Sequence, residues 1–398
     1  MATTIYLDHA ATTPLHPKAL EAMMPFFSER FGNPSTIYSL GQEGRRALDE
    51  ARGTVADILG CNRKEVIFTS GGTESDNAAI KGVAFALRKE GNHIITSSVE
   101  HHAVLETCNY LEKYGFDITY LPVDRYGMVN LEDVRAAIND NTILISIMMA
   151  NNEVGTIEPI ESISHMLKDY STTYEHSIVL HTDAVQGAGF LNLDINKLGV
   201  DILSLSAHKF YGPKGVGILF IKQGTPFIPQ QNGGVQEGHR RAGTENLPGI
   251  IGAATALKLA VESQNSNIAL CRQLRDRLIQ GVHQHIPNAQ LTGHPDYRLP
   301  NNASFCFHYV EGESILLHLD FAGIAAASGS ACTSGSLEPS HCLMAMGVPV
   351  EVAHGSVRFT CGIENTEEEV DKVISVLTQV VLRLREISPF AQAKVNKR

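Results

Sequence analysis

Residues 201–221, DILSLSAHKFYGPKGVGILFI, decide the fold class. Two short apolar runs, Asp201–Ala207 and Gly215–Ile221, flank a turn that contains Gly212, Pro213 and Lys214. Runs of this length are typical of buried β-strands, and glycine and proline favour a tight turn between them. Because the connection is too short for a helix, we expect the two runs to form an antiparallel hairpin.

Similar short apolar runs recur upstream, and each is followed by a helix-like segment. They are Glu65–Ser70, His93–Ser98, Asp117–Val123, Thr142–Ala150 and Ser177–Asp183. Strands that are separated by helices pair in parallel and are covered by those helices on both faces. The series predicts an α/β domain, residues 14–260, in which a seven-stranded, mainly parallel sheet lies between two helical layers.

The sequence after about residue 260 predicts a smaller α+β domain. Helix-like residues 270–285 and a strand at Ala303–His308 precede a closing helix whose start is marked by a capping box, Thr366 with Glu369. Apolar residues then repeat at helical spacing: Val370, Val373, Ile374, Leu377 and Val381. We expect residues 261–398 to form this domain and residues 1–13 to join it.

Composition excludes several classes of function. The chain carries 32 basic and 43 acidic residues, a formal charge of −11, which disfavours direct binding to nucleic acid or to an anionic membrane. No apolar run is long enough to span a bilayer. The seven cysteines are irregularly spaced without a CxxC pair, so we expect no disulfide framework, no metal site and a cytoplasmic location.

The turn Thr69-Ser-Gly-Gly-Thr-Glu-Ser75 lies between a strand and a helical run. Glycines such as Gly72 let backbone N–H groups approach an anion, and the helix N-terminus adds partial positive charge, which suits a phosphate. The alternative is an ordinary tight turn in which Thr73 or a neighbouring serine caps the helix.

Two further strand ends carry candidate chemistry. Lys209, beside the donors Ser206 and His208, could form a Schiff base next to a bound phosphate, although loop lysines are usually only solvated. Asp183 could pair with a pyridinium nitrogen, with Gln186 bonding a ring oxygen, or Asp183 could simply cap a helix.

The pair His101-His102 follows another strand, and one of these rings could stack on an aromatic cofactor and move protons. The alternative is a loop histidine with a satisfied hydrogen bond. Among the cysteines, Cys332 lies in a Gly/Ser-rich stretch, about residues 325–337, that suits a mobile nucleophile. Cys342 is its competitor, with a structural role favoured. The other five are expected to be inert: Cys61, Cys108, Cys271, Cys306 and Cys361.

An ordered set of motifs resembles the pyridoxal-phosphate-dependent cysteine desulfurases of the NifS/IscS type, in the class-V aminotransferase family. The set spans Tyr6 to about Arg385 and includes YLDHAATTP (6–14), FGNPS (31–35), ANNEVGT (150–156), HTDAVQ (181–186), HKFYGPKG (208–215) and SGSACTS (328–334). The resemblance implies the aspartate-aminotransferase-type fold, fold type I, and a homodimer that converts L-cysteine to L-alanine and passes sulfur to an acceptor such as an iron–sulfur scaffold.

The resemblance also assigns roles to residues. It implies that Lys209 forms the Schiff base with pyridoxal 5′-phosphate, that His101 stacks on the ring, and that Cys332 receives sulfur as a persulfide. The remaining cofactor ligands it implies are Gly72, Thr73, Asn152, Asp183, Gln186, Ser206, His208 and, from the second subunit, Thr244. It implies that the substrate is bound by Asn33, Asn152 and Arg358. Two alternatives stay open: a selenocysteine lyase on the same scaffold, and a weakly active sulfur-carrier or interaction protein.

Overall fold

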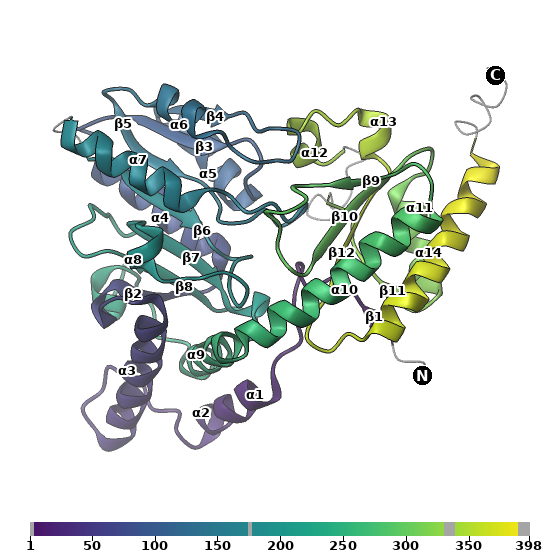
Figure 1. Ribbon diagram of the computed structural model, residues 1–398. Helices are drawn as coiled ribbons and strands as arrows, with labels where there is room; N and C mark the ends of the chain where they lie inside the picture. The colour runs from purple at the N-terminus through teal and green to yellow at the C-terminus, as the bar shows by residue number, and fades with distance from the viewer. Residues whose placement is uncertain (1–3, 174–176, 330–338, 389–398) are drawn as a thin grey trace.

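A computed structural model describes residues 4–173, 177–329 and 339–388 (Figure 1). Its main feature is a seven-stranded sheet, which we call the large sheet, with strand order β2-β8-β7-β6-β5-β3-β4. The strands are β2 (Val66–Thr69), β3 (His93–Ser97), β4 (Asp117–Leu121), β5 (Thr142–Ser146), β6 (Val179–Asp183), β7 (Ile202–Ser206) and β8 (Gly217–Ile221). Each lies within a run that the sequence predicts as a strand, so the α/β prediction is confirmed.

Strand β8 is antiparallel to both of its neighbours. It pairs with β7, as the short Gly-Pro turn predicts, and also with β2 on its other side. The second pairing corrects the expectation that β2, which is followed by a helix, would lie beside a parallel strand. The hairpin places β8 between β2 and β7, so β2 lies at the edge of the sheet, and the remaining pairs are parallel.

The large sheet lies between two helical layers, because its side chains alternate between two apolar cores. In β2, Ile67 faces the core of α4 (Gly72–Ala86) and α5 (His102–Glu112), whereas Val66 and Phe68 face the opposite core. The helices that contribute buried residues to that opposite core are α1 (Pro17–Met23), α2 (Pro25–Ser28), α3 (Ser39–Leu59), α6 (Leu131–Ala137), α7 (Ile160–Thr173), α8 (Ile195–Leu198) and α9 (Leu247–Glu262).

A second, three-stranded antiparallel sheet has the order β12-β10-β9 and is called the small sheet. Its strands are β9 (Ala289–Thr292), β10 (Asn302–Phe307) and β12 (Ser356–Thr360), and it packs with α10 (Gln264–His285), α11 (Gly312–Phe321) and α14 (Glu367–Ile387) (Figure 1). The Thr366–Glu369 capping box begins α14, as the sequence predicts. Short helices α12 (His341–Ala345) and α13 (Val350–Ala353) precede β12.

The N-terminal residues 5–13, called the N-terminal arm, connect the two sheets. Strand β1 (Ile5–Tyr6) pairs with β11 (Ile324–Ala325) in parallel, and Leu7 is buried in the same apolar core as the small sheet. Farther along, Thr13 N donates a hydrogen bond to His208 O at 2.9 Å, at the end of β7. The arm therefore spans the gap between the small sheet and the carboxyl ends of the large sheet.

Three short 3₁₀ turns complete the described structure: η1 (Arg63–Glu65), η2 (Ala207–Lys209) and η3 (Gln236–His239). Within the described ranges no helix is both long enough and apolar enough to cross a membrane. Residues 389–398 and the segment 330–338, which contains Cys332, lie outside the described residues.

Candidate active site

A cavity of about 670 Å³ lies at the carboxyl ends of β6 and β7, next to the N-terminal arm and β12. Ligands of open α/β sheets gather at this end of the strands. The cavity is lined by ten of the thirteen residues that the sequence analysis singles out: Gly72, Thr73, His101, Asn152, Asp183, Gln186, Ser206, His208, Lys209 and Arg358. Folding thus brings into one cavity groups that lie up to 286 residues apart in the chain.

Three predicted site residues are not placed in the cavity. Cys332 lies outside the described residues. Asn33 is half-buried, and its Oδ1 accepts a hydrogen bond from Ser35 N at 2.9 Å. Thr244 is exposed in this single subunit and does not line the cavity.

The Gly-rich turn ends in an uncapped helix. Gly71 is the N-cap of α4, and no side chain accepts a hydrogen bond at this cap, so the alternative of a serine or threonine cap is wrong. A Cβ atom on Gly72 would lie 2.9 Å from the Val185 side chain and 3.9 Å from Ser206 Oγ. The absence of a Cβ therefore keeps the backbone of the first turn open to an anion in the cavity, with Ser206 Oγ beside it.

Asp183 ends β6 with its carboxylate at the cavity. Its Oδ1 accepts a hydrogen bond from Val185 N at 2.9 Å, a local turn contact like the cap considered above, yet no helix follows. Burial raises the pKa of Asp183 to about 6, and the positive charge of Lys209 opposes that rise. The carboxylate is therefore ionised at neutral pH and available to a cationic N–H group.

Lys209 belongs to η2, directly after β7. Its Nζ donates hydrogen bonds to Ala10 O at 2.5 Å and Ala11 O at 2.7 Å, both in the N-terminal arm. Gln186 Nε2 also donates to Ala10 O, at 3.0 Å. The arm therefore holds the amine and the amide at the same side of the cavity.

His101 is the N-cap of α5, and its Nδ1 accepts a hydrogen bond from Ala103 N at 3.1 Å. This bond satisfies one ring nitrogen, as the loop-histidine alternative expects, while the ring still lines the cavity. Burial lowers the pKa of His101 to about 4, and the charge of Lys209 lowers it further. The ring is therefore neutral at pH 7, the form that can accept a proton or stack on an aromatic ring.

Arg358 lies in β12 and reaches the cavity from the small sheet. One of its terminal nitrogens, Nη1, donates to Asn152 O at 2.7 Å, and the other, Nη2, donates to Asp8 Oδ1 at 2.7 Å. A guanidinium is the side chain best suited to bind a carboxylate with two parallel hydrogen bonds. The geometry therefore offers a carboxylate-binding group in the same cavity as Lys209.

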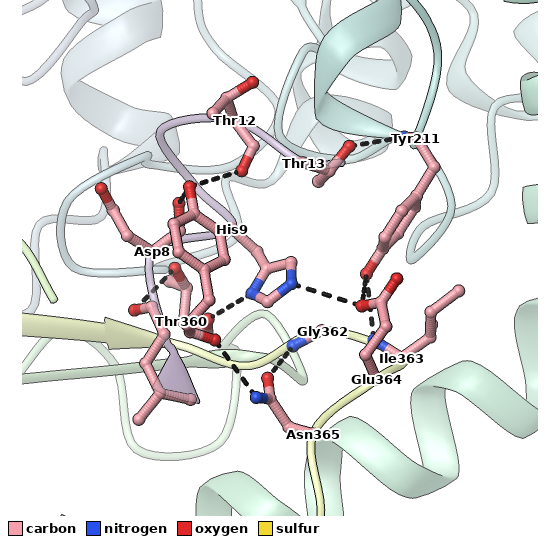
Figure 2. A network of polar contacts seen from close by, with 12 residues as sticks. Asp8, His9, Thr12, Thr13, Tyr211, Thr360, Gly362, Ile363, Glu364 and Asn365 are labelled. Atoms are coloured by element: carbon pink, nitrogen blue, oxygen red, sulfur yellow. Dashed lines mark hydrogen bonds and ion pairs between the residues drawn. The ribbon is translucent and has the colours of Figure 1, made fainter. Parts of the chain in front are cut away.

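Sequence reasoning missed the residues of the arm. Figure 2 shows Asp8, His9, Thr12 and Thr13 of the arm in one polar network with Tyr211 of the Lys209 loop and with residues of the segment 360–365. Thr13 Oγ1 accepts a hydrogen bond from the backbone N of Tyr211 at 2.8 Å, where Tyr211 adopts a left-handed φ of 65°. The motif YLDHAATTP contains these residues, but no local pattern assigns them contacts about 200 and 350 positions away.

Asp76 is a second missed residue. It lines the cavity from α4, is almost completely buried, and its Oδ1 lies 3.6 Å from His181 Nε2. Burial raises the pKa of Asp76 well above its usual range, and the negative charge of Asp183 raises it further. Its helical position after the Gly-rich turn resembles an exposed first-turn carboxylate, so the sequence alone does not reveal that it is buried.

The six described cysteines are all free thiols. Cys342 is buried, and burial raises the pKa of its thiol well above the usual range. Burial also raises the pKa of the Cys108 thiol to about 12 and that of Cys306 to about 12. A neutral buried thiol is a poor nucleophile, so these side chains behave as small apolar groups.

One group of three possible metal ligands occurs among the described residues: Glu153, His341 and Cys342, with donor atoms within 4.8 Å of one another. Each already has a protein partner. Ser340 Oγ donates to Glu153, His341 Nε2 lies 2.9 Å from Glu100 O, and Cys342 Sγ donates to Val99 O at 3.4 Å. Each of the three groups therefore takes part in a hydrogen bond within the protein.

Comparison with known proteins identifies the family of the chain. Residues 5–373 match the aminotransferase class-V family. The chain is 54% identical to the cysteine desulfurase IscS of Dictyoglomus turgidum over the full length of both proteins, and 54% identical to that of Methanosarcina thermophila over 97% of this chain and 94% of that protein.

Solved structures agree as well. A NifS-like protein superposes with a TM-score of 0.90 at 38% identity, covering 96% of this chain and all of the other. A structure described as SspA in complex with cysteine superposes with a TM-score of 0.80 at 34% identity, covering 91% of this chain and all of the other. By family match and by full-length identity, the chain belongs to the class-V aminotransferase family, the pyridoxal-phosphate-dependent enzymes of fold type I.

Proposed function

We propose that this protein is a cysteine desulfurase: it converts L-cysteine to L-alanine and captures the sulfur as a persulfide on Cys332. The observation that carries the proposal is the convergence of Lys209, Asp183 and Arg358 on one cavity. An amine, a buried carboxylate and a guanidinium are the groups needed to hold an aldehyde cofactor and an amino acid together. Relatives named cysteine desulfurase, at 54% identity over the full chain, support the choice of reaction.

The cavity fits pyridoxal 5′-phosphate. The uncapped first turn of α4 suits the phosphate, which Gly72, Thr73, Ser206 and His208 would hold, completed by Thr244 of the partner subunit. Asp183 would hold the ring nitrogen, and Gln186 would donate to the ring oxygen. When bound, this cofactor supplies the electron sink that stabilises negative charge at the substrate Cα.

The residues of the chain divide the remaining tasks. Arg358 binds the substrate carboxylate, assisted by Asn152 and Asn33, and so orients the amino acid. Lys209 would hold the cofactor covalently and would move the proton at the substrate Cα. His101, neutral at pH 7, would stack on the cofactor ring and could accept a proton.

Cys332 performs the sulfur transfer. Its thiolate attacks the substrate sulfur, so that an S–S bond forms while the Cβ–S bond breaks and its electron pair stays with the carbon fragment. Proton transfer to that fragment completes L-alanine, and the sulfur remains on Cys332 as a persulfide. The segment around Cys332, rich in glycine and serine, would then present the persulfide to an acceptor.

We further propose a homodimer, in which Thr244 completes the neighbouring site, and a sulfur-acceptor protein such as an iron–sulfur scaffold. Exposure of Thr244 in a single subunit supports the dimer, and the IscS naming of relatives supports the acceptor class.

Six free thiols among the described residues support a reducing, cytoplasmic location. A domain boundary near residue 13 is supported by the packing of Ile5 and Leu7 into the core of the small sheet. A boundary near residue 260 is supported by Leu257 of α9, which packs into a core of the large sheet, and by Leu274 of α10, which packs into the core of the small sheet.

The test is to incubate the purified protein with L-cysteine, measure alanine release, and locate the added sulfur by peptide mass analysis. We expect stoichiometric alanine and a persulfide on Cys332. Parallel assays with L-selenocysteine separate the enzyme from a selenocysteine lyase, for which selenocysteine alone would react rapidly and leave no persulfide. Failure to release any alanine from cysteine would instead favour a non-catalytic carrier.

A further inference from the structure

Arg358 is held from two sides before any substrate arrives. Its two terminal nitrogens donate to Asp8 Oδ1 and to Asn152 O, each at 2.7 Å. The Arg358 side chain is only 6% exposed, and that of Asp8 is 18% exposed. A partly desolvated arginine–carboxylate pair with a second fixed acceptor has far less rotational freedom than a solvated arginine.

Asp8 is itself fixed by groups outside this pair. Tyr6 Oη donates to Asp8 O at 3.0 Å, and Asp8 bridges in register with Thr360, two residues after Arg358 on β12. The flanking residue Leu7 is fully buried, and its carbonyl accepts a hydrogen bond from Thr360 N at 2.8 Å. The backbone of Asp8 is therefore anchored to the same strand that carries the arginine, and its carboxylate reaches Arg358 from this fixed position.

The guanidinium keeps donors for a ligand. It has five N–H groups, and only Nη1 and Nη2 have partners among the described residues, while the buried Nε has none. Arg358 lines the cavity, whereas Asp8 does not. A carboxylate entering the cavity therefore meets the arginine but not the acid that orients it.

We propose that Asp8 is a positioning residue for substrate recognition: its carboxylate fixes the Arg358 guanidinium in the plane that binds the α-carboxylate of the amino acid. This inference rests on the proposed function, in which Arg358 binds that carboxylate. Asp8 acts through its hydrogen-bond acceptor, so an asparagine with its amide oxygen in the same place preserves the orientation, whereas alanine does not.

The competing explanation is that the Asp8–Arg358 ion pair only stabilises the fold. The structure allows this explanation to be distinguished from a positioning role by experiment. The arm keeps anchors that do not involve the Asp8 side chain: Ala10 N donates to Thr360 Oγ1 at 2.9 Å, and Ile5 and Leu7 pack into the core of the small sheet. Removing the Asp8 carboxylate should therefore leave the arm in place and loosen mainly Arg358.

The experiment compares holoenzymes carrying Asp8→Ala, Asp8→Asn or Arg358→Ala, with Glu43→Gln as a matched control. Glu43 pairs with Arg30 at 2.6 Å outside the cavity. Affinities for L-alanine and for ethylamine, which differ by one carboxylate, are measured by titration of the cofactor's visible absorbance. Steady-state rates with L-cysteine give KM and kcat separately, and melting temperatures report folding.

We expect Asp8→Ala to weaken L-alanine binding and raise KM for cysteine at least tenfold, with ethylamine affinity and kcat within threefold of the parent. Asp8→Asn should restore both to within threefold, and Glu43→Gln should change nothing. Unchanged alanine affinity in Asp8→Ala, equal losses for alanine and ethylamine, or an Asn variant as impaired as Ala would each overturn the proposal.

Arg358→Ala separates this inference from the proposed function. Loss of alanine affinity in Arg358→Ala with no loss in Asp8→Ala refutes only the positioning role of Asp8. If Arg358→Ala itself leaves alanine affinity unchanged, the assignment of the substrate carboxylate to Arg358 fails, and the inference fails with it.

Discussion

The amine of Lys209 donates a hydrogen bond to the backbone oxygen of Ala10 at 2.5 Å, across 199 residues of sequence. The amine at the carboxyl end of β7 thus contacts the N-terminal arm, a segment far away in the sequence. An oriented amine loses less entropy when it reacts with a carbonyl group.

Replacement of Lys209 by alanine should abolish covalent attachment of the cofactor. We expect the protein to lose borohydride-fixable cofactor and at least a thousandfold in alanine release, because no other amine contacts the same two arm carbonyls among the described residues. Lys222→Ala, which removes a surface lysine paired with Asp201, is the control. Fixation of cofactor in Lys209→Ala at the parental level would contradict the assignment.

Replacing Cys332 and replacing Cys342 should have clearly different effects on sulfur transfer. Cys332→Ala should keep the bound cofactor's colour but form no transferable persulfide. Cys342→Ala should keep sulfur transfer within about threefold and cost about 1 kcal/mol of stability, because the buried Cys342 thiol has a raised pKa and serves packing. Mass analysis of the persulfide-bearing peptide checks both, and sulfur on Cys342 would reverse the two roles.

Asp76 should make the cofactor-free protein less stable as pH rises. Its pKa is raised by burial above that of the unfolded chain, so the folded state retains a proton that the unfolded state has lost. Stability is then full below the unfolded pKa of about 3.9 and falls by about 1.4 kcal/mol per pH unit until the folded pKa is reached.

The Asp76→Asn variant tests this dependence, since a neutral amide has no proton to retain. Its stability relative to the parent, measured by denaturant unfolding of cofactor-free protein, should be lowest near pH 4 and should increase toward pH 8. Asp57→Asn, at an exposed position, is the control. If the difference in stability between Asp76→Asn and the parent stays constant from pH 4 to pH 8, Asp76 is ionised in the folded protein and the prediction is wrong.

Arg52 and Glu237 form a buried pair whose disruption should destabilise the protein. Arg52 donates through both terminal nitrogens, at 2.6 and 2.8 Å, to a Glu237 side chain that is 2% exposed. Arg52→Ala leaves that buried carboxylate with the Phe68 N–H donor but without its ion-pair partner, and should cost about 3 kcal/mol. The exposed pair Arg45–Asp49 provides the contrast, because Arg45→Ala should cost less than about 1 kcal/mol. The free energy of unfolding of both variants is measured in urea, and equal losses for Arg52→Ala and Arg45→Ala would refute this prediction.

Local patterns in the sequence determined most of the architecture. The seven strands and the capping box of α14 follow from apolar periodicity and cap chemistry, which depend on neighbours within about four residues. The chemical types at the cavity were also evident: Lys209 and Asp183 lie in motifs of the family that the chain resembles, and the resemblance also implies the role of Arg358.

Tertiary structure alone decided which groups meet. The antiparallel pairing of β8 with β2, the burial of Asp76 beneath the cavity, and the path of the arm from β11 to Lys209 all depend on contacts between distant segments. Asp8 and Arg358 are separated by 350 residues, yet their side chains lie 2.7 Å apart. Such contacts arise only when both sheets are packed around the arm, so local patterns in the sequence do not predict them.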